Sequence, residues 1–246
     1  MSAPGLVESW LEVFNLTAAD LRAWGLAWAR VAPAVTLVPA FGLRALPGPA
    51  RAALGLSIAA CVAPALTPIA SASKLAWPVL LLQQMALGLP VALVAAVGIW
   101  TLVMVGGVVD DLRGAKAEAN IAVLDRPIGP TGALMGLLGC WLFLQSGGPA
   151  RIGAALIRPN LEFKQPLLGA ALHLTQGIQI ALAVAAPLIA ASLVLQLASA
   201  LVTRAANPAH LQPVLEPLKS LALLGILALL LDRLLEASAG LLLRLP

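Results

Sequence analysis

The stretch LAWPVLLLQQMALGLPVALVAAVGIWTLVMVGGVV, from Leu75 to Val109, decides the fold, and it contains no formal charge. A helix that spans a bilayer needs only about 20 apolar residues, so this block is too long for one ordinary span. As a single straight helix it would measure roughly 50 Å, against a hydrocarbon core of about 30 Å. The sequence therefore predicts a helical hairpin or a sharp kink, and Gly88-Leu89-Pro90 is the natural place for it because proline disrupts helix interiors.

Two further blocks, Pro127 to Ala150 and Gln165 to Thr203, also lack charged residues. Of the 246 residues, 61% are hydrophobic and 11% are charged, whereas an ordinary soluble domain is about 25% charged. With so few charges the chain cannot cover itself with a polar shell, so lipid or other apolar helices must surround it. The composition predicts an all-α membrane protein and excludes an ordinary soluble domain.

The charged residues exclude two further classes. The net charge is +4, but Lys and Arg are scattered through every loop instead of gathering on one face, as nucleic-acid binding would require. The same scatter gives no clear membrane orientation. Glu8, Glu12 and Asp20 precede any Lys or Arg, which is the reverse of the charge order in a cleavable signal peptide. We therefore expect neither nucleic acid as a partner nor a targeting peptide.

The apolar blocks and the breaks between them predict two regions. We expect residues 1–22 to contain a short amphipathic helix along a surface, and residues 23–246 to form a single helical membrane domain. A Pro- and Gly-rich loop over 42–51, a polar loop over 110–130 and a break at Pro187 should divide this domain. The result is about six to eight helical segments, arranged as hairpins, over roughly 23–41, 52–70, 75–109, 131–145, a C-terminal hairpin over 165–246, and a last helix from Pro217. Several pieces are shorter than a comfortable span, so not all helices should cross a bilayer in the ordinary way.

Few residues could carry catalysis. The chain has two histidines, His173 and His210, and the pentapeptide at 55–59 is only partly similar to a membrane-protease serine motif. The adjacent Asp110 and Asp111 point away from each other and fit a solvated loop edge better than an aspartyl dyad. There is no metalloprotease, nucleotide-phosphate or dinucleotide motif. We expect no enzyme activity, no catalytic residue, no cofactor and no metal site.

Polar residues inside the apolar segments have alternative interpretations. Arg30 faces a partner or a water-filled cavity, or it extends its charged end from a helix terminus to the interface. Cys61 and Cys140 are expected to be buried small hydrophobes, and Gly132 with Gly136 forms a GxxxG pair suited to close helix packing. Five glutamines either hydrogen-bond between helices or line a polar path: Gln83, Gln84, Gln176, Gln179 and Gln196.

An ordered set of short motifs covers the chain from about residue 25 to residue 230. It consists of Arg30, Pro39-Ala40-Phe41-Gly42, Leu46-Pro47, Arg51 before a helix that ends at Pro64, Gly88, Gly106-Gly107, Asp110, Arg113-Gly114-Ala115, Ser146-Gly147-Gly148, Ala186-Pro187, Arg204 and Pro217-Leu218-Lys219. Each motif alone is weak, but their order resembles that of the FliR/SctT family of export-gate proteins. The pieces at 113–114 and 147–148 are closer to the injectisome branch than to the flagellar branch.

The resemblance implies that one copy of this chain joins P/R-type and Q/S-type subunits in a closed helical export gate. A switch or autoprotease subunit and an export-gate ring would adjoin it on the cytoplasmic side. Unfolded protein substrates would pass through this gate, across the bacterial inner membrane. Helices in that family stack as hairpins, which fits the short segments noted above. The resemblance gives structural or assembly roles to Arg30, Pro39, Gly42, Pro47, Arg51, Gly106, Gly107, Asp110, Arg113, Gly114, Pro187, Arg204, Pro217 and Lys219.

The chain departs from the family pattern at two places. Asn207 stands where a proline usually follows Arg204, and Gln83-Gln84 replaces a glutamate that is common before Gly88. The alternative function is a small-molecule transporter, which should have broken helices, buried ions near the bilayer midplane and often an internal repeat. The sequence predicts the broken helices without the buried ion pairs. Dependence on partner subunits would separate the two functions.

Overall fold

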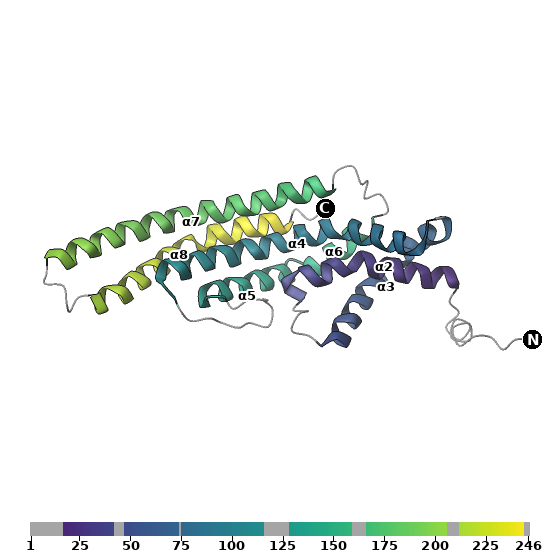
Figure 1. Ribbon diagram of the computed structural model, residues 1–246, viewed down its shortest axis with the longest axis horizontal. Helices are drawn as coiled ribbons and strands as arrows, with labels where there is room; N and C mark the ends of the chain where they lie inside the picture. The colour runs from purple at the N-terminus through teal and green to yellow at the C-terminus, as the bar shows by residue number, and fades with distance from the viewer. Residues whose placement is uncertain are drawn as a thin grey trace, which may run out of the picture.

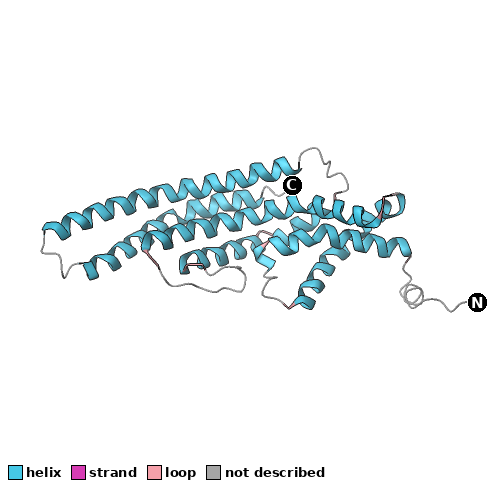
Figure 2. Ribbon diagram, viewed as in Figure 1, coloured by secondary structure: helices cyan, strands magenta, loops and turns pink. Residues whose placement is uncertain are grey.

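The computed structural model describes residues 17–41, 47–73, 75–115, 128–158, 166–205 and 212–243. Within these ranges the chain is helical and contains no strand (Figure 2), which confirms the all-α prediction. The helices are α2 (Ala18–Leu37), α3 (Gly48–Ala72), α4 (Trp77–Arg113), α5 (Pro130–Gln145), α6 (Gly148–Ile157), α7 (Pro166–Ala205) and α8 (Gln212–Leu243), with a short 3-10 helix η1 (Pro39–Phe41) after α2.

Helix α4 is the axis of this elongated molecule. It contacts α2 near one end and α5, α7 and α8 along the rest of its length, while α3 lies against α2 (Figure 1). Its sequence is apolar on every side, as expected of a helix surrounded by others. Most positions from Val91 to Leu102 are accordingly buried. The remaining helices are arranged around this central helix.

The hairpin expected at Gly88-Leu89-Pro90 is wrong. These residues are interior positions of α4, which continues without interruption from Trp77 to Arg113 (Figure 1). The expectation treated lipid as the surroundings of the whole block. Neighbouring helices cover most of it instead, since 67% of its most apolar stretch is buried inside the protein. The length of α4 is therefore not limited by the thickness of a bilayer.

Helices α7 and α8 form an antiparallel pair that lies along α4 (Figure 1). The break expected at Pro187 is wrong, because α7 runs through this residue from Pro166 to Ala205. Proline removes one hydrogen bond from a helix, but membrane helices tolerate such a loss through local adjustment. Helix α8 begins at Gln212, so Pro217 lies within its first turns.

Several helix ends differ from the expected boundaries because of capping. Helix α2 begins at Ala18, before the expected boundary after residue 22, because Thr17 and Asp20 form a capping box. Residues 1–16 of the expected amphipathic segment lie outside the described residues. Helix α3 begins at Gly48 rather than at residue 52, with Pro49 in its first turn, where a missing N–H leaves no hydrogen bond unmade.

The expected polar loop over 110–130 is partly helical. Residues 110–113 are the last turn of α4, which ends where Gly114 adopts φ 65°, and residues 116–127 lie outside the described residues. The sequence interpretation did not predict α6, whose ten residues follow α5 after Gly147 at φ 73°. Helices α5 and α6 thus form a short broken pair beside α4.

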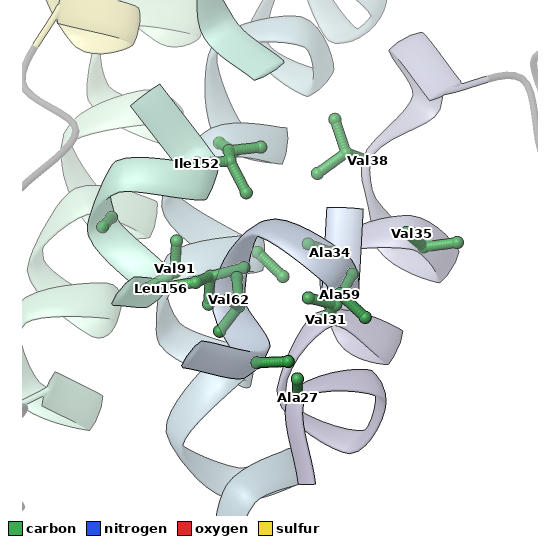
Figure 3. Packing of buried hydrophobic residues seen from close by; sticks show 14 of the residues in the cluster. Ala27, Val31, Ala34, Val35, Val38, Ala59, Val62, Val91, Ile152 and Leu156 are labelled. Carbon is green, nitrogen blue, oxygen red and sulfur yellow. The ribbon is translucent and has the colours of Figure 1, made fainter. Parts of the chain in front are cut away.

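Two clusters of buried apolar residues hold the helices together. One cluster joins α2, α3, α4, α5 and α6, and Figure 3 shows its small and branched side chains, among them Ala27, Val31, Ala59 and Val62, packed between the helix backbones. Small residues of this kind let helices approach closely, which is the main source of packing energy in membrane helices. The second cluster joins α4 and α5 to the α7–α8 pair and includes Leu102, Val105, Met135, Leu188, Leu227 and Leu234.

Four of the described helices are long and apolar enough to cross a membrane. They are α3, α4, the part of α7 from Ala171 to Ala205 and the part of α8 from Val214 to Gly240. Helix α5, at 16 residues, is apolar but shorter than a span. The protein is therefore an all-α membrane protein with helices of unequal length.

Candidate functional site

A buried arginine joins three helices. The side chain of Arg30 in α2 has no exposed surface. Its Nε donates a hydrogen bond of 2.8 Å to Oε1 of Gln84 in α4, and its Nη1 donates one of 2.9 Å to the carbonyl oxygen of Leu156 in α6. The first alternative from the sequence, a partner inside the protein, is therefore confirmed. The second, an arginine that reaches out to the interface, is wrong.

The surroundings of Arg30 explain how the cation is stabilised. No described carboxylate pairs with it, and its Nη2 has no hydrogen-bond partner among the described residues. Leu156 is the second-last residue of α6, so its carbonyl oxygen lies at the negative end of that helix dipole. A helix C-terminus leaves its last carbonyls without partners, and Arg30 satisfies one of them. A helix dipole and a neutral amide thus take the place of an anion.

Gly88 brings α4 into direct contact with the backbone of Arg30. A Cβ atom at this position would overlap the carbonyl oxygen and carbon of Arg30. Only glycine permits so close an approach between the two helices. The same contact brings Gln84, one turn earlier in α4, within reach of the Arg30 guanidinium. Gly88 is therefore a packing residue inside a continuous helix and not the turn of a hairpin.

A buried aspartate contacts the opposite kind of helix end, the N-terminus of α5. The Asp110 side chain in the last turn of α4 accepts hydrogen bonds from the backbone N–H groups of Thr131, at 3.1 Å, and Gly132, at 2.8 Å. These are the first unpaired N–H groups of α5, where the helix dipole favours a negative charge. Asp110 is buried, so its assignment to a solvated loop edge is wrong because α5 covers it. Asp111 is exposed as expected.

Arg113 extends this contact to the C-terminal hairpin. Its Nη1 lies 3.8 Å from Oδ1 of Asp110 and donates a hydrogen bond of 3.0 Å to Oγ1 of Thr131. Its Nε donates a hydrogen bond of 2.6 Å to Oγ of Ser220 in α8. One pair of charged residues on α4 therefore fixes the start of α5 and a point on α8 at the same place.

Glycines bring α4 and α5 together beside this pair. A Cβ atom on Gly106 would lie 2.6 Å from the Cα of Gly132, well inside van der Waals contact. The predicted role of Gly132 in close packing is confirmed, and it is packing within the chain, against α4. Gly107 differs, since a Cβ there would meet nothing within 4 Å.

The other predicted residues lie apart from these two contacts. Pro39 begins η1, Pro47 precedes α3, and Gly114 ends α4. Pro187, Arg204 and Pro217 are exposed on α7 and α8, and Lys219 is half-buried on α8. Arg51 lies in α3, but its side chain is outside the described residues, as is Gly42. The structure thus brings together Gly106, Asp110 and Arg113, and it places Arg30 in a separate contact.

Sequence reasoning missed Thr131, Ser220 and the carbonyl group of Leu156 as partners. The Gly129-Pro130-Thr131 sequence is typical of a helix start, so an acidic side chain near it could have been foreseen. The carbonyl of Leu156 carries no signal in its residue type. Gln84 was identified as able to bond between helices, which is confirmed, whereas the Gln196 amide reaches Ser192 of its own helix at 3.4 Å.

The described residues contain no group of three or more His, Cys, Asp or Glu side chains able to hold a metal ion. Cys140 is buried as expected, but the burial expected for Cys61 is wrong, because this residue lies on an outer face of α3. Each of the two charged contacts satisfies backbone groups at a helix end.

Replacement of Asp110 by Ala should lower the stability of the protein by about 2 kcal/mol, because two N–H groups of α5 lose their acceptor. Asp110→Asn should lose about half as much, since its amide oxygen still accepts one hydrogen bond. The thermal unfolding midpoint in detergent micelles measures both effects. Asp111→Ala is the matched control at the exposed neighbouring position, and equal midpoints for the two alanine variants would contradict the capping role.

Comparison with known proteins places these contacts in a family. The family model described as bacterial export proteins, family 1, matches residues 21–245, which include both charged contacts and all the described helices except the start of α2. No curated protein matches the chain. The match covers far more than half of the sequence, so this chain belongs to family 1 of the bacterial export proteins.

Proposed function

We propose that the protein is the single-copy T-type subunit of a type III export gate, of the FliR/SctT branch, in the bacterial inner membrane. It acts as a structural part of a channel for unfolded proteins and not as an enzyme. Membership of an export family and the four apolar helices long enough to span a membrane support this proposal.

The outer surface of the α7–α8 hairpin is the observation that carries the proposal furthest. Only 22% of the most apolar stretch of α7 and 11% of that of α8 is buried, against 67% for α4. Large apolar side chains therefore point outward along both helices, including Leu172, Leu182, Leu193, Leu197, Leu201, Leu218, Leu221 and Leu229. An apolar surface of this extent needs lipid or other protein chains to cover it.

Charged residues on α8 indicate that neighbouring protein chains, rather than lipid, cover much of this surface. Asp232, Arg233 and Glu236 are exposed on the helix, within the range that is long and apolar enough to span. Lipid around them would leave three charges in hydrocarbon, which is costly. Neighbouring subunits can instead supply polar partners. The proposed neighbours are the P/R-type and Q/S-type gate subunits, with the switch or autoprotease subunit and the export-gate ring on the cytoplasmic side.

The proposed mechanism is passive. Apolar packing among the subunits keeps the channel closed, and an unfolded substrate passes when a cytoplasmic engine and the proton gradient supply energy. The contacts of Arg30 and Asp110 keep the subunit rigid while its outer hairpin contacts its neighbours. The match to an export family does not favour a small-molecule transporter.

Native mass spectrometry tests the proposal. The tagged chain is expressed in a bacterial membrane with and without candidate P/R-type and Q/S-type partners. We expect one copy of this chain in a hetero-oligomer with both partners, and low recovery of the chain alone, because its outer hairpin is then uncovered. A stable monomer or homodimer that ignores the partners would overturn the gate assignment and favour a transporter.

A further inference from the structure

We infer that a cavity between α7 and α8 binds a lysine or arginine side chain from a neighbouring protein chain. This inference rests on the proposed function, since it requires a neighbour across the hairpin. The cavity has a volume of about 570 Å³. Gln176, Gln179, Ile180 and Ala183 line it from α7, and Glu236 and Ala237 line it from α8.

Two hydrogen-bond acceptors in this cavity have no donor among the described residues. Oε1 of Gln176 is buried and has no hydrogen-bond partner among the described residues. The Glu236 carboxylate makes no ion pair or hydrogen bond with any described residue, and Arg233, one turn earlier on α8, is not within ion-pair distance of it. A buried acceptor without a donor, such as Oε1 of Gln176, is rare in folded proteins, because burial removes its hydrogen bonds to water.

The chemistry of the lining selects the occupant. A carboxylate and an amide oxygen both accept hydrogen bonds, and the carboxylate is negatively charged, so the missing group is a cation with more than one donor. Lysine and arginine side chains have three and five donors, respectively. Ile180, Ala183 and Ala237 provide apolar walls that fit the methylene groups of such a side chain.

The position of the cavity favours a side chain from another protein chain. Glu236 and Gln179 are exposed, so the cavity opens on the outer surface of the hairpin. The surrounding surface is apolar, with Leu172 57%, Leu182 62% and Leu229 83% exposed. A helix that covered this surface would also remove water from Glu236, and an unpaired carboxylate there would be strongly unfavourable. A basic residue on the covering helix supplies the pair.

Carboxylate labelling with a water-soluble carbodiimide and glycine ethyl ester tests this site, with the labelled peptides quantified by mass spectrometry. The carbodiimide activates the carboxylate, and the amine of the ester then forms an amide and releases a urea. We expect Glu236 to react at least about five-fold more slowly in the assembled gate than in the isolated chain, because a buried pair is shielded from reagent and water. Asp111, exposed in the last turn of α4 and outside the cavity, is the internal control.

Two variants separate the pair from simple coverage. Glu236→Lys should reduce recovery of the assembled gate by about ten-fold, since it brings two cations together, whereas Asp111→Lys should have little effect. Equal labelling of Glu236 and Asp111 within an intact gate, or equal recovery of the two lysine variants, overturns the site alone. Protection of Glu236 in the isolated chain in phosphatidylethanolamine vesicles assigns the cavity to a lipid amine and overturns the site too. Failure to assemble with any gate partner overturns the proposed function itself.

Discussion

Replacement of Gly88 by Ala should reduce the stability of the protein by on the order of 3 kcal/mol or more, the largest effect that we expect from one added methyl group. The new Cβ atom would overlap the backbone carbonyl of Arg30, and neither of the two helix backbones can move aside as a flexible side chain could. Helices α2 and α4 would have to separate, which would also break the hydrogen bond between Arg30 and Gln84. The thermal unfolding midpoint and the yield of monodisperse protein in detergent measure this loss.

Gly107→Ala is the matched control for Gly88→Ala. It lies in the same helix, but a Cβ there would meet no atom within 4 Å. Alanine is a better helix former than glycine, so the free energy of unfolding of this variant should rise by about 0.5–1 kcal/mol. The two substitutions are chemically identical and should change the midpoint in opposite directions. A similar midpoint for both would mean that α2 and α4 are not in contact at Gly88.

Replacement of Arg30 by Ala should lower the free energy of unfolding by about 3–5 kcal/mol, because it leaves a cavity and removes the donor to two buried acceptors. Gln84 in α4 and the carbonyl of Leu156 at the end of α6 would both lose the donor that Arg30 provides from α2. The double variant Arg30→Met with Gln84→Leu should recover most of this loss, since well-packed apolar side chains often replace a buried polar contact without penalty. The free energy of unfolding in detergent, measured for each single and double variant, gives the coupling between residues 30 and 84.

Arg22→Ala in the same helix is the control, since Arg22 is exposed. Its free energy of unfolding should change by no more than about 0.5 kcal/mol. If Arg30→Ala unfolded at the same temperature as Arg22→Ala, the guanidinium of Arg30 would have to lie in water, and the contact with α6 would be wrong. A double variant no more stable than Arg30→Ala would mean that Gln84 contributes nothing to the effect.

The fold class followed from composition, whereas the helix lengths did not. The 35 uncharged residues from Leu75 identified a membrane helix, but the number of segments in it depended on what surrounds it. A block of this length in lipid has to break, but inside a bundle it can remain straight, and the sequence does not distinguish lipid from protein as the apolar solvent. The prolines at positions 90 and 187 predicted breaks, but both lie inside continuous helices.

The residues of the candidate site were easier to find than their roles. Arg30 stood out because a charge within an apolar block is costly, and the structure gives it partners as one alternative required. Asp110 was misassigned because its partners are backbone groups of α5, which begins 20 residues later in the sequence. Backbone partners of this kind leave no pattern in residue types. The choice among functions within the export family likewise depends on surfaces that meet other chains.

The distance along the chain between Arg30 and its partners has a consequence for biogenesis. Gln84 is 54 residues and Leu156 is 126 residues downstream of Arg30. At a synthesis rate of about 5–20 residues per second, roughly 6–25 seconds pass between translation of Arg30 and translation of Leu156. During that interval α2 has left the ribosome with a cation that has no helix end to cap. A nascent chain arrested before residue 156 must therefore keep this side chain in water or against the insertion machinery, and the N-terminal helices reach their final packing only after α6 has been made.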